Sequence, residues 1–127
     1  MRESFVLDTG ALIALERFDQ ALWQRLKEAR RRGGDIVVPA GVVAEAWRGG
    51  PRSAPLTRLL AFCEVDPLDE ERAREVGVRL GGRNARNVVD AHVVCCALER
   101  RAAIATSDPT DMESLAGTNE HLTLAVL

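Results

Sequence analysis

The chain has 127 residues, of which 46% are hydrophobic and 28% are charged. These values are ordinary for one soluble globular domain and exclude a disordered or low-complexity chain, so we expect a single domain over residues 1–127. The net charge of −2 excludes a strongly cationic nucleic-acid binder, although 17 basic residues leave room for a local basic patch.

The sequence shows no sign of a membrane segment or a secretory signal. Its apolar runs fall short of the roughly 20 residues that span a membrane, and the N-terminus does not have the pattern of a signal peptide. The three cysteines, Cys63, Cys95 and Cys96, do not have metal-site spacing, and the adjacent pair lies in an apolar helical run typical of small buried side chains. We therefore expect a cytoplasmic protein.

The first half of the chain alternates short apolar runs with helical patterns. We expect strands at residues 4–7 and 35–39 and helices at 11–15, about 19–32 and 40–48. Thr9 and Gly10 are predicted to form the turn after the first strand, and Gly49-Gly50-Pro51 is predicted to end the third helix.

The second half continues the alternation. We expect helices at residues 54–62, 69–80, with Asp69 as N-cap, 88–101 and from Asp108-Pro109 onward, and strands around Val65, at 102–106 and at 122–127. Strands that alternate with helices imply a parallel sheet covered on both faces. The predicted fold class is therefore α/β, with a central, mainly parallel sheet of four or five strands.

Four acidic residues stand in or beside apolar stretches, where an unpaired charge is costly: Asp8, Glu45, Asp90 and Asp108. Asp8 and Asp108 follow strands, and open parallel sheets bind ligands at the carboxyl ends of their strands. Asp90 lies in the most apolar helix, and Glu45 has apolar neighbours on both sides.

Each of these acids also has a purely structural interpretation. Asp8 and Asp108 are at positions where aspartate caps a helix, and Asp108 is followed by a proline suited to the first helical turn. Glu45 can pair with Arg48, and Asp90 lies near a helix N-terminus, where the dipole favours negative charge. The four acids form a site only if the fold brings them together.

Clustered carboxylates suit Mg²⁺ or Mn²⁺ better than zinc, which prefers nitrogen and sulfur. His92 and His121 do not have partners at zinc-site spacing, so no metal-ligand role is assigned to them. Four neighbouring carboxylates would repel one another strongly without a cation. The hypothesis is a pocket of oxygen ligands for a divalent cation that serves phosphate chemistry.

Four segments in this order resemble the PIN domain, and at this length the VapC-type toxins of bacterial toxin–antitoxin pairs: Leu7-Asp8-Thr9, Val42-Val43-Ala44-Glu45, Val89-Asp90-Ala91 and Thr106-Ser107-Asp108-Pro109-Thr110-Asp111. The resemblance implies a three-layer α/β/α fold, Mg²⁺- or Mn²⁺-dependent cleavage of RNA, a cognate antitoxin protein and a homodimer. It also implies that Asp8, Glu45, Asp90 and Asp108 are the catalytic, metal-binding acids, supported by Thr9, Thr106 and Asp111. Gly10 and His92 depart from the commonest family pattern.

Recognition of the substrate is less well defined by the sequence. Four arginines near the acids in sequence are candidates for phosphate binding: Arg48, Arg52, Arg83 and Arg86. Tyrosine is absent and the few aromatic residues stand mostly in core-like contexts, so a platform for base stacking is not expected. Two alternatives stay open: a PIN-like module that binds RNA or protein without cutting, and a PIN nuclease that is not a toxin.

Overall fold

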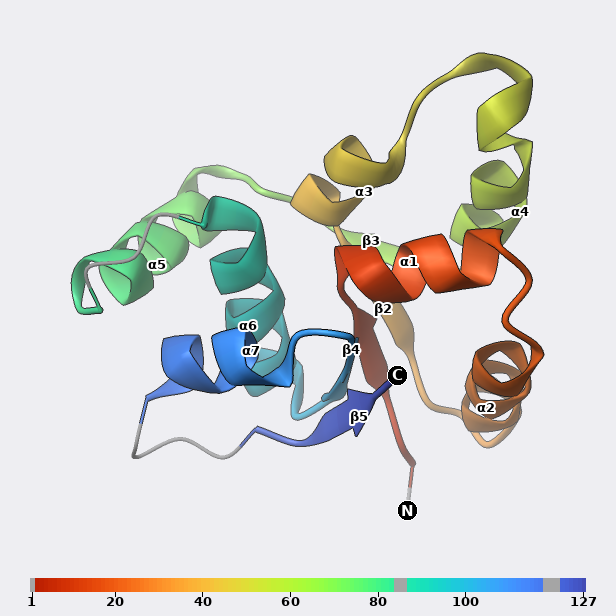
Figure 1. Ribbon diagram of the computed structural model, residues 1–127. Coiled ribbons are helices and arrows are strands. Elements are labelled where there is room, and N and C mark those ends of the chain that lie inside the picture. The colour runs from red at the N-terminus through yellow and green to blue at the C-terminus, as the bar shows by residue number, and fades with distance from the viewer. Residues whose placement is uncertain (1, 84–86, 118–121) are drawn as a thin grey trace.

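The computed structural model describes residues 2–83, 87–117 and 122–127 (Figure 1). At the centre of this part of the chain is a five-stranded sheet in the order β3-β2-β1-β4-β5, in which every neighbouring pair is parallel. The strands are β1 (Phe5–Leu7), β2 (Ile36–Pro39), β3 (Glu64–Asp66), β4 (Ala103–Thr106) and β5 (Leu124–Val126). The predicted α/β class with a central parallel sheet is confirmed.

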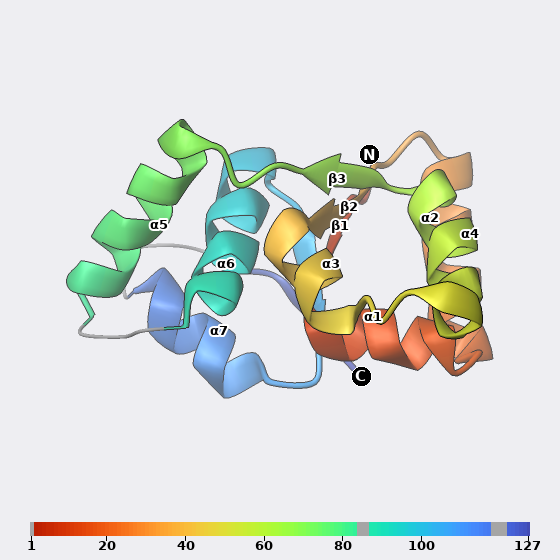
Figure 2. The same cartoon turned by 90° about the horizontal axis from the view of Figure 1, so that it is seen from above.

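Helices cover both faces of the sheet, which gives three α/β/α layers. The helices are α1 (Thr9–Glu16), α2 (Gln20–Arg31), α3 (Ala40–Ala46), α4 (Ala54–Phe62), α5 (Glu70–Gly81), α6 (Val88–Arg100) and α7 (Pro109–Ala116), with a 3-10 helix η1 (Gly50–Ser53). One layer contains α1, α2 and α4, and the other contains α5, α6 and α7 (Figures 1 and 2). The short helix α3 follows β2 directly and contacts both α1 and α6, so it joins the two layers.

The core forms where the central strands meet the apolar helix faces. All residues of β1 and β4 are buried, and α6 packs against β1, β2 and β4 with seven consecutive buried residues, Ala91 to Ala97. Cys95 and Cys96 lie within this run, as the sequence predicts. Because each fully buried Val or Leu side chain contributes about 1.5–3 kcal/mol, this contact fixes α6 firmly on the sheet.

The turn predicted at Thr9 and Gly10 is wrong, because α1 begins at Thr9 itself. The Asp8 carboxylate accepts the backbone N–H of Ala11 (2.8 Å) and so caps the helix immediately after β1. Gly10 permits this geometry, since a Cβ at that position would lie 2.3 Å from Oγ of Ser107 in the loop after β4. The first turn of α1 can therefore approach that loop closely.

The helix predicted over 40–48 ends earlier, at Ala46, because Trp47 adopts an extended backbone. The next residues form η1, which the sequence did not predict. The hydroxyl of Ser53 accepts the backbone N–H groups of Arg48 (3.0 Å) and Gly49 (2.9 Å) and so holds this segment in place. Among the described residues, no helix is both long enough and apolar enough to cross a membrane.

Candidate active site

Asp8 and Asp108 follow neighbouring strands at the same edge of the sheet. Asp8 comes directly after β1, and its backbone N–H donates to the carbonyl of Ala105 in β4 (3.2 Å). Asp108 stands two residues after β4, at the residue before α7. Because β1 and β4 pair in parallel, their carboxyl ends meet there. The structure thus brings together the two acids at strand ends.

The Asp8 carboxylate is almost completely buried, with 4% of its surface exposed. Burial raises its pKa above the ordinary value, and the charge of Asp108 adds a smaller increase. Hydrogen bonds from the Thr106 hydroxyl and from the backbones of Ala11 and Ser107 oppose this increase. Asp8 is therefore a helix cap in this structure, but a cap that also lies beside a second carboxylate in a poorly solvated position.

Thr106, at the end of β4, links these two acids. Its side chain is fully buried, and its hydroxyl oxygen accepts the backbone N–H of Asp108 (2.8 Å) while the hydroxyl group donates to the Asp8 carboxylate. One hydroxyl can make both bonds, since it has one donor and two acceptor sites. The threonine expected to support the site thus positions Asp8 and the start of the Asp108 loop. The Asp108 side chain itself makes no hydrogen bond to the start of α7.

Glu45 reaches the same region from α3. Its side chain is exposed, and its Oε1 accepts a hydrogen bond from the hydroxyl of Thr9 in the first turn of α1 (2.5 Å). This bond joins two helices that lie side by side over the carboxyl ends of the strands (Figure 2). The Arg48 guanidinium instead donates to the carbonyl of Trp47 (2.9 Å). The Glu45 side chain is therefore held against the start of α1, the helix that Asp8 caps.

Asp90 completes the group from the first turn of α6. Its backbone N–H donates to the side chain of Asn87, the N-cap of that helix (2.9 Å). Burial raises the pKa of its carboxyl to about 6, and the charges that add to this increase belong to Asp111, Asp8, Glu45 and Asp108. The structure therefore gathers five acids, the four predicted ones and Asp111, closely enough for their charges to act on Asp90.

These acids fit a hard divalent cation in chemistry. Among residues 2–83, 87–117 and 122–127, no group of three or more Asp, Glu, His or Cys side chains is placed so that it could hold a metal ion without moving. The donors are nevertheless all carboxylate oxygens, which Mg²⁺ and Mn²⁺ prefer, and their charges add to the effect of burial in raising the pKa of Asp90. Glu45 and Asp108 are exposed, so their side chains are the ones with room to turn toward a bound cation.

The four arginines predicted near the acids differ in their surroundings. Arg48 and Arg52 are exposed in the segment after α3. Arg83 instead donates to the carbonyls of Arg79 (3.3 Å) and Ala116 (2.9 Å), where it binds the C-terminal end of α7. Arg86 lies outside the described residues, as does His121. Of the three arginines that the structure describes, Arg48 and Arg52 are the exposed ones, so they are the better candidates for contact with a substrate phosphate.

The expectation that aromatic residues lie mostly in the core holds only in part. Trp23 and Phe62 pack against the core and against each other, with ring centroids 5.8 Å apart. Phe18 and Trp47, however, are exposed. Trp47 follows α3 directly, two residues after Glu45, so one exposed indole lies close in sequence to the acid cluster.

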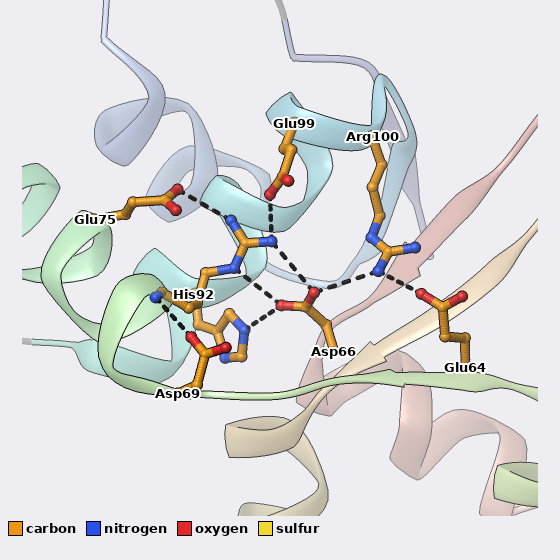
Figure 3. A network of polar contacts seen from close by, with 8 residues as sticks. Glu64, Asp66, Asp69, Glu75, His92, Glu99 and Arg100 are labelled. Carbon is orange, nitrogen blue, oxygen red and sulfur yellow. Dashed lines mark hydrogen bonds and ion pairs between the residues drawn. The ribbon is translucent and has the colours of Figure 1, made fainter.

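His92 turns away from the acids, as its spacing from Asp90 predicts. It is fully buried, and its Nε2 lies 2.7 Å from Oδ2 of Asp66 at the end of β3. Asp66 also accepts two hydrogen bonds from the guanidinium of Arg72 (3.1 and 3.2 Å) and one from Arg100 (3.3 Å) (Figure 3). Exposed acids surround the arginines: Glu75 and Glu99 contact Arg72, and Glu64 contacts Arg100.

This buried network is the principal polar feature that the sequence did not reveal. It joins β3, α5 and α6, and so attaches the helix that carries Asp90 to the edge of the sheet. Burial alone would raise the pKa of Asp66, but the hydrogen bonds from Arg72 and His92 outweigh it and hold the pKa below its ordinary value. In the sequence, the only indication of this network is an aspartate, Asp66, at the end of a predicted strand and before Pro67.

A large open groove lies away from the acids, between α5 and α6. Its volume is about 950 Å³, and its lining includes the apolar side chains of Val78, Leu98 and Cys95. Val78 is 78% exposed. Acidic residues line the part of the groove at the start of α5, and arginines line the part toward its end. The groove shares no residue with the acid cluster, so it is a surface separate from the candidate site.

Comparisons with known proteins agree with the geometry. The family model described as "PIN domain" matches residues 5–117. No curated protein matches the chain. Among solved structures, FitAB bound to an IR36 DNA fragment is 15% identical with a TM-score of 0.68, and the match covers 96% of this chain and 94% of that chain.

Two further solved structures are similar to the same extent. VapBC2 from Rickettsia felis, bound to a DNA fragment from its promoter, is 13% identical with a TM-score of 0.65, covering 97% and 98% of the two chains. FitAcB from Neisseria gonorrhoeae is 16% identical with a TM-score of 0.63, covering 94% and 95%. At these identities the likeness establishes a shared fold over nearly the whole length of each chain.

Proposed function

This chain belongs to the PIN domain family, whose members are generally nucleases, and we propose that it is a Mg²⁺- or Mn²⁺-dependent endoribonuclease, the toxin of a toxin–antitoxin pair. Asp8, Glu45, Asp90 and Asp108 are the proposed catalytic and metal-binding residues. The observation that carries the proposal is the convergence of these acids at the carboxyl edge of the sheet, where burial, and then the neighbouring charges, raise the pKa of Asp90 to about 6. Such an unfavourable arrangement is best explained by a cation that offsets it.

The protein's own residues position the reactants. Asp8 is fixed by its bonds to α1 and Thr106, and Asp90 by the packing of α6, so two acids come from rigid elements. Glu45 and Asp108 are exposed and free to adjust, and Thr9 holds Glu45 until it does. A divalent cation bound there would lower the pKa of a water molecule and offset charge on the scissile phosphate. Asp111, whose charge also acts on Asp90, supports the cluster from α7.

The proposed substrate is RNA, and the proposed location is the cytoplasm. Arg48 and Arg52 are exposed beside α3 and are available for the phosphates next to the cleaved bond. Because phosphate contacts carry no sequence information, these arginines would position the strand without selecting its sequence. A role of Arg86 in the same task stays a prediction, and Arg83 would have to leave the end of α7 to take part.

The proposed partner is a cognate antitoxin. The similar structures FitAB and VapBC2 are both complexes bound to DNA fragments, and the R. felis fragment comes from the promoter of that pair. In this chain, the cluster of acids suits a basic antitoxin side chain, which would compete with cation and substrate for the same carboxylates. We propose inhibition of this kind.

We also propose a homodimer, and the α5–α6 groove is the surface that supports it. In an antiparallel pairing of two copies, the acidic start of α5 (Glu70, Glu71) would face the arginines toward the end of the partner's groove, and the exposed Val78 would be covered. Val78→Glu is expected to convert the dimer to a monomer in sedimentation analysis. Val65→Glu, on the edge strand β3 outside the groove, is the matched control, and equal sedimentation of both variants would refute this interface.

Cleavage of a labelled single-stranded RNA tests the nuclease directly. Wild-type protein should cut in Mn²⁺ or Mg²⁺ and stop in EDTA, and Asp90→Asn should lower the rate at least a hundredfold. The matched control is Asp35→Asn, the same substitution at an exposed position at the opposite end of the sheet, before β2. Binding of RNA without cutting would favour the alternative of a PIN-like binding module, and cleavage by Asp90→Asn at the wild-type rate would show that the site is elsewhere.

A further inference from the structure

Trp47 is an exposed aromatic residue that follows the helix carrying Glu45, one of the clustered acids. Its residue surface is 41% exposed, whereas the other tryptophan, Trp23, packs against the core. It directly follows α3, two residues after Glu45, and begins the segment that leads to α4 (Figure 2). An exposed indole offers a large apolar face together with an N–H donor to a ligand.

The backbone around Trp47 is held by specific bonds. The Trp47 N–H donates to the carbonyl of Val43 (2.8 Å), and its own carbonyl accepts the guanidinium of Arg48 (2.9 Å). Ser53 fixes the next two residues by accepting both of their backbone N–H groups. Gly49, at φ +77°, lies beside the indole, since a Cβ on it would be 4.0 Å from Nε1. The indole is therefore presented from a preorganised loop.

The charges of the same segment indicate which ligand this is. Arg48 and Arg52 are both exposed within five residues of Trp47. An aromatic face combined with arginines matches single-stranded nucleic acid, in which a base stacks on the ring while the cations contact phosphates. Bases in a duplex are already stacked on each other and do not offer a free face to an indole.

We infer that Trp47 stacks on an unpaired base of single-stranded RNA next to the phosphate presented to the acid cluster. The inference rests on the proposed nuclease function and adds a binding residue to it. It departs from the expectation, drawn from the sequence, that a platform for base stacking is absent. Trp47 contacts the base in this account and takes no part in bond cleavage.

Tryptophan fluorescence provides the test, because the chain has two tryptophans. In Trp23→Phe protein, titration with a short single-stranded RNA in EDTA should quench the emission of Trp47, and duplex RNA should not. In Trp47→Phe protein, the emission of Trp23 should stay unchanged. A single-stranded DNA of the same sequence should quench as well, since the indole contacts the base and not the sugar.

The affinity for single-stranded RNA should fall about ten- to a hundredfold in Trp47→Ala and return largely in Trp47→Phe. Phe18→Ala, at the other exposed aromatic residue, is the control and should bind as the wild type does. Unchanged RNA affinity of Trp47→Ala would overturn the inference, and so would a change in its oligomeric state without a change in affinity. Because EDTA prevents cleavage, Trp47-dependent binding by a protein that never cuts RNA would refute the nuclease and not the stacking.

Discussion

Replacing Asp66 with asparagine is expected to destabilise the protein by about 2–4 kcal/mol. The carboxylate is 4% exposed and accepts hydrogen bonds from Arg72, His92 and Arg100. Removal of one partner from a buried ion pair costs on the order of 3–5 kcal/mol, because the other charge stays buried. Arg72 also contacts the exposed acid Glu75, which compensates in part, so we expect a cost of about 2–4 kcal/mol, slightly below that range.

Urea unfolding followed by circular dichroism measures this cost. With a slope of about 1–2 kcal/mol per molar urea, the midpoint should fall by roughly 1–4 M. Asp69→Asn is the matched control: Asp69 caps α5 through the backbone N–H of Arg72, and asparagine caps helices as well as aspartate does. If Asp66→Asn loses no more stability than Asp69→Asn, the reasoning about the buried network is wrong.

The cost of Asp66→Asn should also depend on pH. Burial raises the pKa of Asp66, but Arg72 and His92 lower it by more, so the folded-state pKa lies below the unfolded one. Such a group contributes stability above its unfolded pKa of about 4 and loses that contribution as the pH falls through the folded value. The difference between wild type and variant should therefore be greatest near neutral pH and shrink below about pH 4.

Three further predictions follow from single residues. Phe18 is 62% exposed and has φ +62°, a left-handed backbone conformation that is costly for residues with a side chain. Phe18→Gly should therefore raise the free energy of unfolding by about 0.5–1 kcal/mol in urea titrations, and a decrease would contradict this. Burial raises the pKa of Cys63 and Cys96 to about 12, so both thiols should react with iodoacetamide at pH 8 far more slowly than free cysteine, and rapid labelling of the native protein would refute it. Burial, and then the neighbouring charges, raise the pKa of Asp90 to about 6. In EDTA, the free energy of unfolding should therefore fall as the pH rises from about 4 through 6, because Asp90 loses its proton less readily in the folded protein than in the unfolded chain. Asp90→Asn should remove this fall from urea titrations, and an unchanged pH profile would contradict the prediction.

The elements that the sequence predicts correctly are those with strong local signals. The helix over 54–62 has the predicted bounds, and Asp69 caps α5 as expected. The start of α1 was predicted too late in the chain. Gly10 lies in the first turn of this helix, against the distant residue Ser107, and a side chain at position 10 would collide with the Ser107 hydroxyl. Local propensity cannot show such a contact.

The candidate site could be predicted in outline and not in its surroundings. Strand ends in a parallel sheet place Asp8 and Asp108 together by topology alone. The bond between Thr9 and Glu45 depends on how α1 and α3 pack, and the network around Asp66 joins residues from three elements. No sequence spacing encodes these contacts. Likewise, Trp47 follows a mostly apolar run, yet its side chain is exposed where the chain leaves α3.

The most direct test of the central claim is calorimetric titration of the metal-free protein with Mn²⁺ at pH 7.5. If the acids form a divalent-cation site, the wild type should bind Mn²⁺, Asp90→Asn should bind it at least tenfold more weakly, and Asp35→Asn should bind it as the wild type does. The absence of binding to the wild type, or equal binding to the wild type and Asp90→Asn, would contradict the claim that this acid cluster holds the catalytic metal.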